Sequence, residues 1–170
     1  MAIKDKAIYF LDIIGKNKGI LYKVSNIYCR SFEDRKDLIQ EIILQLWKSF
    51  DNYNDQFKYS TWIYRIALNV AISFYRKEVR RSQISNALST DILDFPDDEL
   101  PQKKESNLGL LNQLISQLND LDKALILLYL EERNYKEISE IIGITETNVA
   151  TKISRIKIKL QKEFNKSKHQ

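Results

Sequence analysis

Apolar residues recur at helical spacing along most of this chain, which predicts a series of helices. The clearest stripe repeats at four-residue steps and consists of Leu38, Ile39, Ile42, Ile43, Leu46, Trp47 and Phe50. Such a stripe is typical of an amphipathic helix with one buried face. The polar residues 51–56 predict a loop, because Asp and Asn favour turns over helix interiors. A second stripe then runs from Trp62 to Phe74, and we expect Ser60 or Thr61 to cap its helix.

Three or four further helices are expected near the C-terminus, each with a recognisable start. They cover residues 108–118, 121–130 and 135–142, and a last one follows Thr145. Asp120 is the expected cap of the second helix, and Asn134 with Glu137 forms a capping-box pattern. Gly143 can adopt the left-handed conformation that ends a helix. A short helix, a glycine turn and a second helix predict a helix-turn-helix, with a plain helical hairpin as the alternative.

Composition and charge divide the chain into three parts. Residues 82–106 lose the apolar periodicity, contain both prolines and carry a net charge of −4, whereas residues 1–81 carry +6 and residues 107–170 carry +2. We therefore predict an all-α protein with two small helical domains, 1–81 and 107–170, joined by an acidic flexible linker at 82–106. Two basic domains indicate a polyanionic partner.

Several classes of function find no support in the residues. Cys29 is the only cysteine and His169 the only histidine, so one chain cannot form a disulfide, a zinc knuckle or a Cys/His nucleophile pair. The four glycines match no phosphate-binding loop. We expect no catalytic site, no metal and no cofactor. The longest apolar run has seven residues and no secretion signal is visible, which favours a cytoplasmic protein that does not enter a membrane.

Aromatic and basic residues are concentrated in one stretch. Nine of the eighteen aromatic residues lie between Trp47 and Tyr75, and Arg76, Lys77, Arg80 and Arg81 follow directly. Aromatic rings can stack on unpaired bases while Lys and Arg neutralise phosphates, which indicates binding of melted DNA. Burial of the rings in a core is the alternative. Likewise, Asp34, Asp37, Gln40, Glu41, Gln45 and Lys48 form a polar helix face that is either solvated or a docking surface.

Three strings of residues resemble bacterial RNA polymerase sigma factors of the extracytoplasmic-function (ECF) type, which keep conserved regions 2 and 4. They are DLIQE at residues 37–41, STWIYRIALNVA at residues 60–71 and YKEISEIIGI at residues 135–144. The resemblance covers nearly the whole chain. It implies a non-enzymatic subunit that binds core polymerase, directs it to promoters and helps to melt the −10 element.

The resemblance also assigns residues to three surfaces. The surface expected to melt and read the −10 element, with an extruded base in a pocket, contains Tyr53, Asn54, Phe57, Tyr59, Ser60, Thr61, Trp62, Arg65, Asn69, Arg76 and Lys77. The surface expected to read the −35 element as duplex contains Thr147, Asn148, Ala150, Thr151, Lys152 and Arg155. The surface expected to bind core polymerase contains Asp37, Leu38, Gln40, Glu41 and Lys48.

The implied partners are promoter DNA and core RNA polymerase, through its β′ clamp helices and β flap. The acidic residues 91–99 would mimic RNA in the polymerase channels. Lys152 stands where the family commonly has Arg, and Lys lacks the bidentate fork that reads guanine, so the base preference at −35 stays open. The sequence also leaves open whether an anti-sigma factor or another recruiting protein binds the chain.

Two other functions remain as alternatives. A free-standing helix-turn-helix regulator would explain the C-terminal domain but not the aromatic stretch or the string at residues 37–41. A helical adaptor or a sigma mimic that no longer reads DNA is the second alternative.

Overall fold

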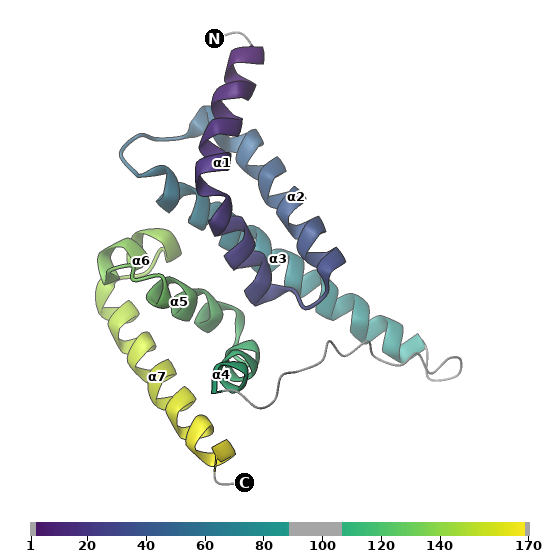
Figure 1. Cartoon of the computed structure of the whole chain (residues 1–170), viewed down its shortest axis with the longest axis vertical. Coiled ribbons are helices and arrows are strands. Elements are labelled where there is room, and N and C mark those ends of the chain that lie inside the picture. Colours follow the sequence, from purple (N-terminus) through teal and green to yellow (C-terminus); the bar gives the residue numbers. More distant parts are fainter. Residues whose placement is uncertain (1–2, 89–106, 169–170) are drawn as a thin grey trace.

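The computed structural model describes residues 3–88 and 107–168 of the chain, with side chains described for residues 4–81 and 107–168 (Figure 1). These residues form helices throughout: α1 (Ile3–Tyr28), α2 (Phe32–Ser49), the short 3-10 helix η1 (Phe50–Asn52), α3 (Tyr59–Leu88), α4 (Asn107–Ser116), α5 (Asp120–Leu130), α6 (Tyr135–Ile142) and α7 (Glu146–Lys168). The described residues contain no strand, so the all-α prediction is confirmed.

Helices α1, α2 and α3 pack against one another as the N-terminal domain (Figure 1). Leu38, Ile42 and Leu46 of α2 are completely buried, which confirms the inward-facing stripe. Burying a side chain of this kind stabilises the folded state by about 1.5–3 kcal/mol. Ser31 caps α2, since its hydroxyl accepts a hydrogen bond from the Asp34 backbone N–H at 3.0 Å. Cys29 is a free, buried cysteine in the core of this domain.

Helix α3 differs from the prediction at both ends. It begins at Tyr59, and the Trp62 backbone N–H already donates to the Lys58 carbonyl at 3.1 Å. The prediction that Ser60 or Thr61 caps this helix is therefore wrong, because both residues lie in its first turn. At the other end the helix continues to Leu88, beyond the boundary expected at residue 81. The rest of the predicted linker, residues 89–106, lies outside the described residues.

Helices α4 to α7 form the C-terminal domain. Its core includes five completely buried side chains: Leu125, Leu128, Ile138, Val149 and Ile153. The capping box of Asn134 and Glu137 is present, and Gly143 adopts φ +83°, so both predicted ends of α6 are confirmed. The Thr145 hydroxyl accepts from the Asn148 backbone N–H at 3.2 Å and caps α7. These caps hold the helix-turn-helix in its turn geometry.

The cap of α5 is one residue earlier than predicted. Asn119 has the extended backbone of an N-cap (φ −68°, ψ 167°), and its side chain accepts from the Asp122 backbone N–H at 2.9 Å. Asp120, the expected cap, is instead the first residue of the helix, where its charge favours the positive end of the helix dipole.

The two domains pack directly on each other, which the sequence did not predict. The Tyr28 hydroxyl of α1 donates to the Asp120 carbonyl at 2.6 Å, and Lys123 of α5 lies over the Tyr75 ring of α3 with its Nζ 4.5 Å from the ring centroid. Lys123 is only 3% exposed. Burial lowers the pKa of the Lys123 ammonium and raises that of the Tyr28 hydroxyl above its usual range. Contact between the domains thus removes polar groups of both from water.

No helix among the described residues is long and apolar enough to cross a membrane.

Candidate nucleic-acid interface

A small cavity opens where the loop after η1 meets the start of α3. It has a volume of about 200 Å³ and is lined by Asn52, Asn54, Phe57, Thr61, Trp62 and Arg65. The loop is shaped by local hydrogen bonds: the Asn54 side-chain oxygen accepts from the Gln56 backbone N–H at 3.0 Å, and the Tyr53 hydroxyl donates to the Phe57 carbonyl. An Asn side chain that closes such a turn is typical of this residue type. The cavity is therefore lined by the rings of Phe57 and Trp62, the amides of Asn52 and Asn54, and the guanidinium of Arg65.

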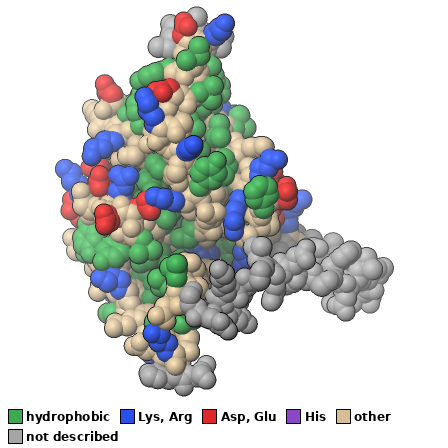
Figure 2. All heavy atoms as spheres, viewed as in Figure 1, with side chains coloured by type: hydrophobic (Ala, Val, Ile, Leu, Met, Phe, Trp, Pro, Cys, Tyr) green, Lys and Arg blue, Asp and Glu red, His purple; other side chains and the backbone are tan. Residues whose placement is uncertain are grey.

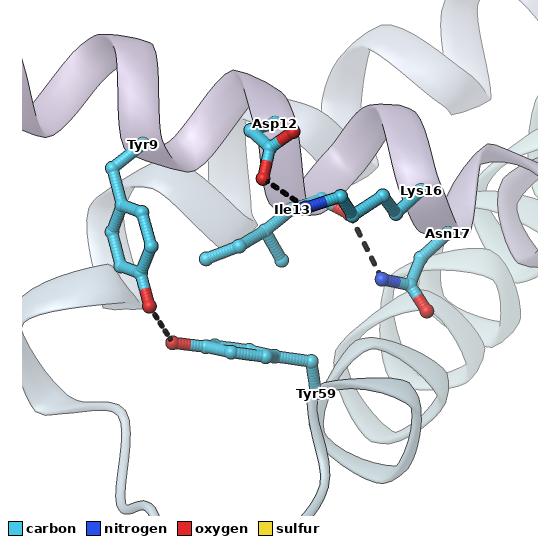
Figure 3. Close-up of polar contacts among 6 residues, drawn as sticks. All are labelled: Tyr9, Asp12, Ile13, Lys16, Asn17 and Tyr59. Atoms are coloured by element: carbon cyan, nitrogen blue, oxygen red, sulfur yellow. Dashed lines mark hydrogen bonds and ion pairs between the residues drawn. The ribbon is translucent and has the colours of Figure 1, made fainter.

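Two of the predicted rings support this cavity rather than line it. Tyr53 and Tyr59 stack with ring centroids 4.4 Å apart and an interplanar angle of 18°, and the Tyr53 and Trp62 rings pack in a T-shaped arrangement with centroids 5.3 Å apart. Figure 3 shows Tyr9 of α1 pointing toward Tyr59, and their hydroxyl oxygens are 3.0 Å apart. This hydrogen bond, with burial, raises the pKa of Tyr59 to about 12. Tyr53 and Tyr59 thus fix the loop while Phe57 and Trp62 remain at the cavity.

The ring cluster is attached to α1 and α2 as well. Phe50 lies 6.1 Å from Trp62 and 5.2 Å from Phe10 between ring centroids. Lys6 of α1 pairs with Asp51 at 2.6 Å and lies over the Trp47 ring. The alternative of a buried aromatic core is therefore correct for part of the stretch, because several rings interlock. Phe57 and Trp62 are only partly buried and border the cavity, although Trp62 also packs against the core.

Two of the cations predicted to meet DNA phosphates, Arg65 and Arg76, contact the C-terminal domain. Arg65 lies over the Phe57 ring, 5.0 Å from its centroid, and donates to the Glu140 carbonyl. Arg76 pairs with Asp120 at 3.0 Å. Lys58, which the sequence analysis did not assign, lies 3.8 Å from a carboxylate oxygen of Glu137. On the face seen in Figure 2, Lys and Arg side chains are interspersed with Asp and Glu side chains.

The remaining residues predicted for the −10 surface lie in several places. Thr61 is buried and forms part of the cavity wall, and Ser60 is partly buried beside it in the first turn of α3. Asn69 and Lys77 are exposed and line a different cavity, the groove between α2 and α3. Asn52 was missed, although it belongs to the predicted loop and precedes Asn54 by two residues. The structure thus separates the predicted set into a cavity, its supports and a groove.

The groove between α2 and α3 has a volume of about 900 Å³. Asp37, Gln40 and Glu41 lie on its α2 side, at the docking surface predicted from the sequence. Leu38 is completely buried beneath that surface, and Lys48 is exposed on α2 without lining the groove. The α3 side of the groove contributes Ile66, Val70 and Phe74. The floor of the groove is therefore apolar and its rim is polar.

The N-terminal part of α7 presents a polar row. Thr147, Asn148, Thr151 and Arg155 are exposed, whereas Ala150 and Lys152 are partly buried. Val149, Ile153 and Ile156 face the core. A second helix of a helix-turn-helix with such an exposed N-terminal row has the form that enters a major groove.

In the described part of the chain, no group of three or more His, Cys, Asp and Glu residues could hold a metal ion.

Comparison with known proteins groups these surfaces into two conserved regions. Residues 13–81, with the loop cavity and the groove, match Sigma-70 region 2, and residues 108–160 match Sigma-70, region 4.

Individual relatives extend over most of the chain. It is 29% identical over 167 residues to the ECF RNA polymerase sigma factor SigW of Bacillus subtilis, with 91% of this chain and 88% of SigW covered. It is 25% identical over 146 residues to the ECF RNA polymerase sigma-E factor of Haemophilus influenzae, with 78% and 77% covered. The sigma factor RpoE of Bartonella quintana, solved in complex with the anti-sigma factor NepR, has the same fold with a TM-score of 0.67, at 19% identity over 96% of this chain and 98% of that chain.

Proposed function

The chain belongs to the ECF group of sigma-70 factors, and we propose which of its surfaces bind core polymerase, the −10 element and the −35 element. The protein binds core RNA polymerase and directs it to promoter DNA for transcription initiation. The assignment of individual residues to each step is our proposal. It includes a cytoplasmic site of action, where polymerase and promoter meet, and a role in binding rather than catalysis.

The N-terminal domain opens the −10 element by capturing one base in the loop cavity. The observation that carries this assignment is the cavity itself: at about 200 Å³ it is smaller than a drug-sized site and suits a single planar group. Phe57 and Trp62 offer ring surface for stacking, and the amides of Asn52 and Asn54 offer donors and acceptors for a base edge. Extrusion of a base costs a few kcal/mol, which a fitted pocket offsets only for the correct base. Recognition of the base and opening of the two strands then occur in the same step.

Three cations of the N-terminal domain hold the backbone of the melted strand. Lys58 directly precedes α3 and Arg65 and Arg76 lie along it, and each of the three contacts a residue of the C-terminal domain. Lys and Arg in such a row bind phosphates irrespective of sequence. Specificity therefore resides in the cavity and affinity in the cations.

The groove between α2 and α3 receives a helix of core polymerase. An apolar floor with a polar rim fits the docking of an amphipathic helix. Asp37, Gln40 and Glu41 supply the rim contacts, and Leu38 supports them from below. The resemblance to the family supports the β′ clamp as the source of that helix.

The C-terminal domain binds the −35 element with α7. Thr147, Asn148 and Thr151 face base edges while Lys152 and Arg155 hold phosphates. Neither domain needs to bind tightly alone, because attachment of one raises the effective concentration of the other at its site.

An anti-sigma factor or another recruiting protein is a further candidate partner. A solved structure with this fold is a complex with an anti-sigma factor, which motivates a search for such a protein here. Co-purification from the native host, with the partner identified by mass spectrometry, would test it.

Transcription in vitro tests the proposed function. Purified chain added to core polymerase should give transcripts from promoters selected from a random library, and neither component alone should do so. Binding of duplex DNA without any promoter-dependent transcription would favour the free-standing regulator instead. Retention of core polymerase without selective transcription would favour the sigma mimic.

A further inference from the structure

The start of α1 contacts the chain at both ends of the loop that borders the cavity. We call this loop, residues 51–58, the −10 loop. At its first residue, Lys6 pairs with Asp51 at 2.6 Å. Directly after its last residue, the hydroxyl oxygen of Tyr59 lies 3.0 Å from that of Tyr9 (Figure 3). Lys6 and Tyr9 are three positions apart and therefore neighbours on one face of the helix. One turn of α1 thus holds both ends of the −10 loop.

A series of contacts leads from Tyr9 to the rings that line the cavity. Tyr59 stacks on Tyr53 with ring centroids 4.4 Å apart. The Tyr53 hydroxyl donates to the Phe57 carbonyl, and the Tyr53 ring packs on the Trp62 ring at 5.3 Å between centroids. Phe57 and Trp62 are therefore both in contact with Tyr53, and α1 reaches Tyr53 through Tyr59.

Burial does not explain the tyrosine at position 9. Its side chain is 46% exposed, whereas Phe10 and Ile13 of the same helix are almost completely buried in the core. The Tyr9 ring lies 6.1 Å from the Phe50 ring between centroids, at the edge of the ring cluster. The hydroxyl of Tyr9 is thus the group that connects α1 to the far end of the −10 loop.

This connection begins outside the part of the chain that matches Sigma-70 region 2. The match starts at residue 13, so it includes the −10 loop and Tyr59 but neither Lys6 nor Tyr9. The residues that hold the loop therefore belong to the N-terminal turns of α1 that precede the match.

We propose that Tyr9 is a positioning residue for base capture, which acts through Tyr59 and Tyr53 to keep the walls of the loop cavity at the spacing that accepts one base. The inference rests on the proposed function of that cavity. A pocket selects its ligand only when its walls are held in place, because walls that can move also fit other ligands. Without the contact between the two hydroxyls, the stacked tyrosines lose their attachment to α1. Capture of the base should then weaken, while contacts to DNA phosphates elsewhere remain.

Two substitutions of Tyr9 separate the hydroxyl from the ring. Tyr9→Phe removes the contact with Tyr59 and keeps the ring beside Phe50, whereas Tyr9→Ala removes both. The matched controls are Tyr22→Phe and Tyr22→Ala. Tyr22 belongs to the same helix, is 55% exposed and lies about 20 Å farther along α1.

The measured quantity is the part of the binding affinity that depends on the captured base. Each full-length variant in complex with core polymerase is titrated with a single-stranded −10 oligonucleotide, intact or with an abasic site at each position in turn. Tyr9→Phe should weaken binding of the intact strand roughly two- to tenfold, as expected for one hydrogen bond between neutral groups. It should leave binding of the strand that lacks the captured base unchanged. Tyr9→Ala should weaken binding of the intact strand further, and both Tyr22 variants should match the wild-type chain.

A double-mutant cycle with Tyr59→Phe tests whether the two hydroxyls act as a pair. Once Tyr59 lacks its hydroxyl, Tyr9→Phe should have no further effect on the base-dependent part of the affinity. An equal effect of Tyr9→Phe in both backgrounds would contradict the inference.

The other outcomes distinguish the inference from the proposed function. If an abasic site weakens binding of the wild-type complex at one position and neither Tyr9 variant alters that loss, Tyr9 does not position the cavity and the proposed function stands. If the Tyr9 variants weaken binding of intact and abasic strands equally, Tyr9 acts on folding alone and the inference is wrong. If no abasic site affects the wild-type complex, base capture in the cavity is wrong and the inference falls with it.

Discussion

At the scale of single residues, Phe57 is the ring of the loop cavity that we expect to contact a base. Its ring forms one wall and has the Arg65 guanidinium on it at 5.0 Å. Tyr53 accounts for the shape of the loop, since its hydroxyl donates to the Phe57 carbonyl. The ring that would meet a base is thus positioned by a neighbour that would not.

Replacement of Phe57 by Ala should weaken binding of the melted −10 strand. Loss of one stacking ring corresponds to about 1–3 kcal/mol, or roughly a 5- to 150-fold loss of affinity. Fluorescence anisotropy with a −10 oligonucleotide and the polymerase complex would measure it. Phe32→Ala is the control, because Phe32 is 73% exposed at the start of α2, away from the cavity. Equal losses in both variants would show that the ring acts on folding rather than on DNA.

The buried thiol of Cys29 should make the free energy of unfolding depend on pH. Burial raises the pKa of its thiol from 9.0 to about 11, because the thiolate is poorly solvated in the core. The unfolded chain ionises first, so this residue contributes stability below pH 9 that is lost between pH 9 and 11. Cys29→Ala should flatten the fall in unfolding free energy over that interval in urea titrations. A fall as steep as in the wild-type chain would assign it to tyrosines such as Tyr64, whose pKa burial raises to about 12.

At the scale of elements, the helix-turn-helix depends on how α6 ends. Gly143 has φ +83°, and a Cβ at this position would meet open space, so only the backbone conformation resists a side chain. A left-handed conformation costs an L-residue about 1–2 kcal/mol. The angle between α6 and α7 therefore depends on the absence of a side chain.

Alanine substitution at two glycines should change stability in opposite directions. Gly143→Ala should destabilise the C-terminal domain by about 1–2 kcal/mol. Gly19→Ala should stabilise the N-terminal domain by about 0.5–1 kcal/mol, because Gly19 lies inside α1 with open space around it and Ala favours helices. Chemical denaturation of both variants measures the difference. A loss of stability at both positions would mean that α1 needs its glycine for packing.

Binding of duplex DNA by helix α7 should depend on the salt concentration. Lys152→Ala and Arg155→Ala should each weaken binding to −35 duplex and reduce the slope of log affinity against log salt by about 0.9. Lys162→Ala, near the exposed C-terminal end of the same helix, should leave the slope unchanged. Binding isotherms at several salt concentrations distinguish them. An unchanged slope in the first two variants would move the duplex-binding surface elsewhere.

Local signals explain which elements could be predicted. The stripe on α2 and the caps Asn134, Gly143 and Thr145 follow from spacing and side-chain chemistry within a few residues, and all are confirmed. The cap of α5 was misplaced by one residue, because the neighbouring Asn119 and Asp120 can both take this role. Helix α3 begins at Tyr59, before both residues that were expected to cap it.

Long-range contacts explain what could not be predicted of the site. The hydrogen bond between Tyr9 and Tyr59 and the place of Asn69 in the groove depend on the relative positions of α1, α2 and α3. The stacking of Tyr53 on Tyr59 depends on how the loop between them folds. Nothing within a short window of sequence distinguishes a ring that lines the cavity from one that supports it.

At the scale of the whole molecule, packing of the domains links the two proposed DNA surfaces. Contacts such as Arg76 with Asp120 and Tyr28 with the Asp120 carbonyl join residues more than forty positions apart. Binding of DNA or polymerase at one domain therefore acts on a molecule whose two domains are in contact.

The capture of one −10 base in the loop cavity is the central claim, and a double-mutant cycle with abasic DNA tests it most directly. Each nucleotide of the −10 strand is replaced in turn by an abasic site, and affinity for the polymerase complex is measured with the wild-type chain and with Phe57→Ala. We predict one position at which removal of the base weakens binding to the wild-type complex, and at which Phe57→Ala abolishes most of that effect. Equal abasic losses in the two proteins at every position would contradict the claim.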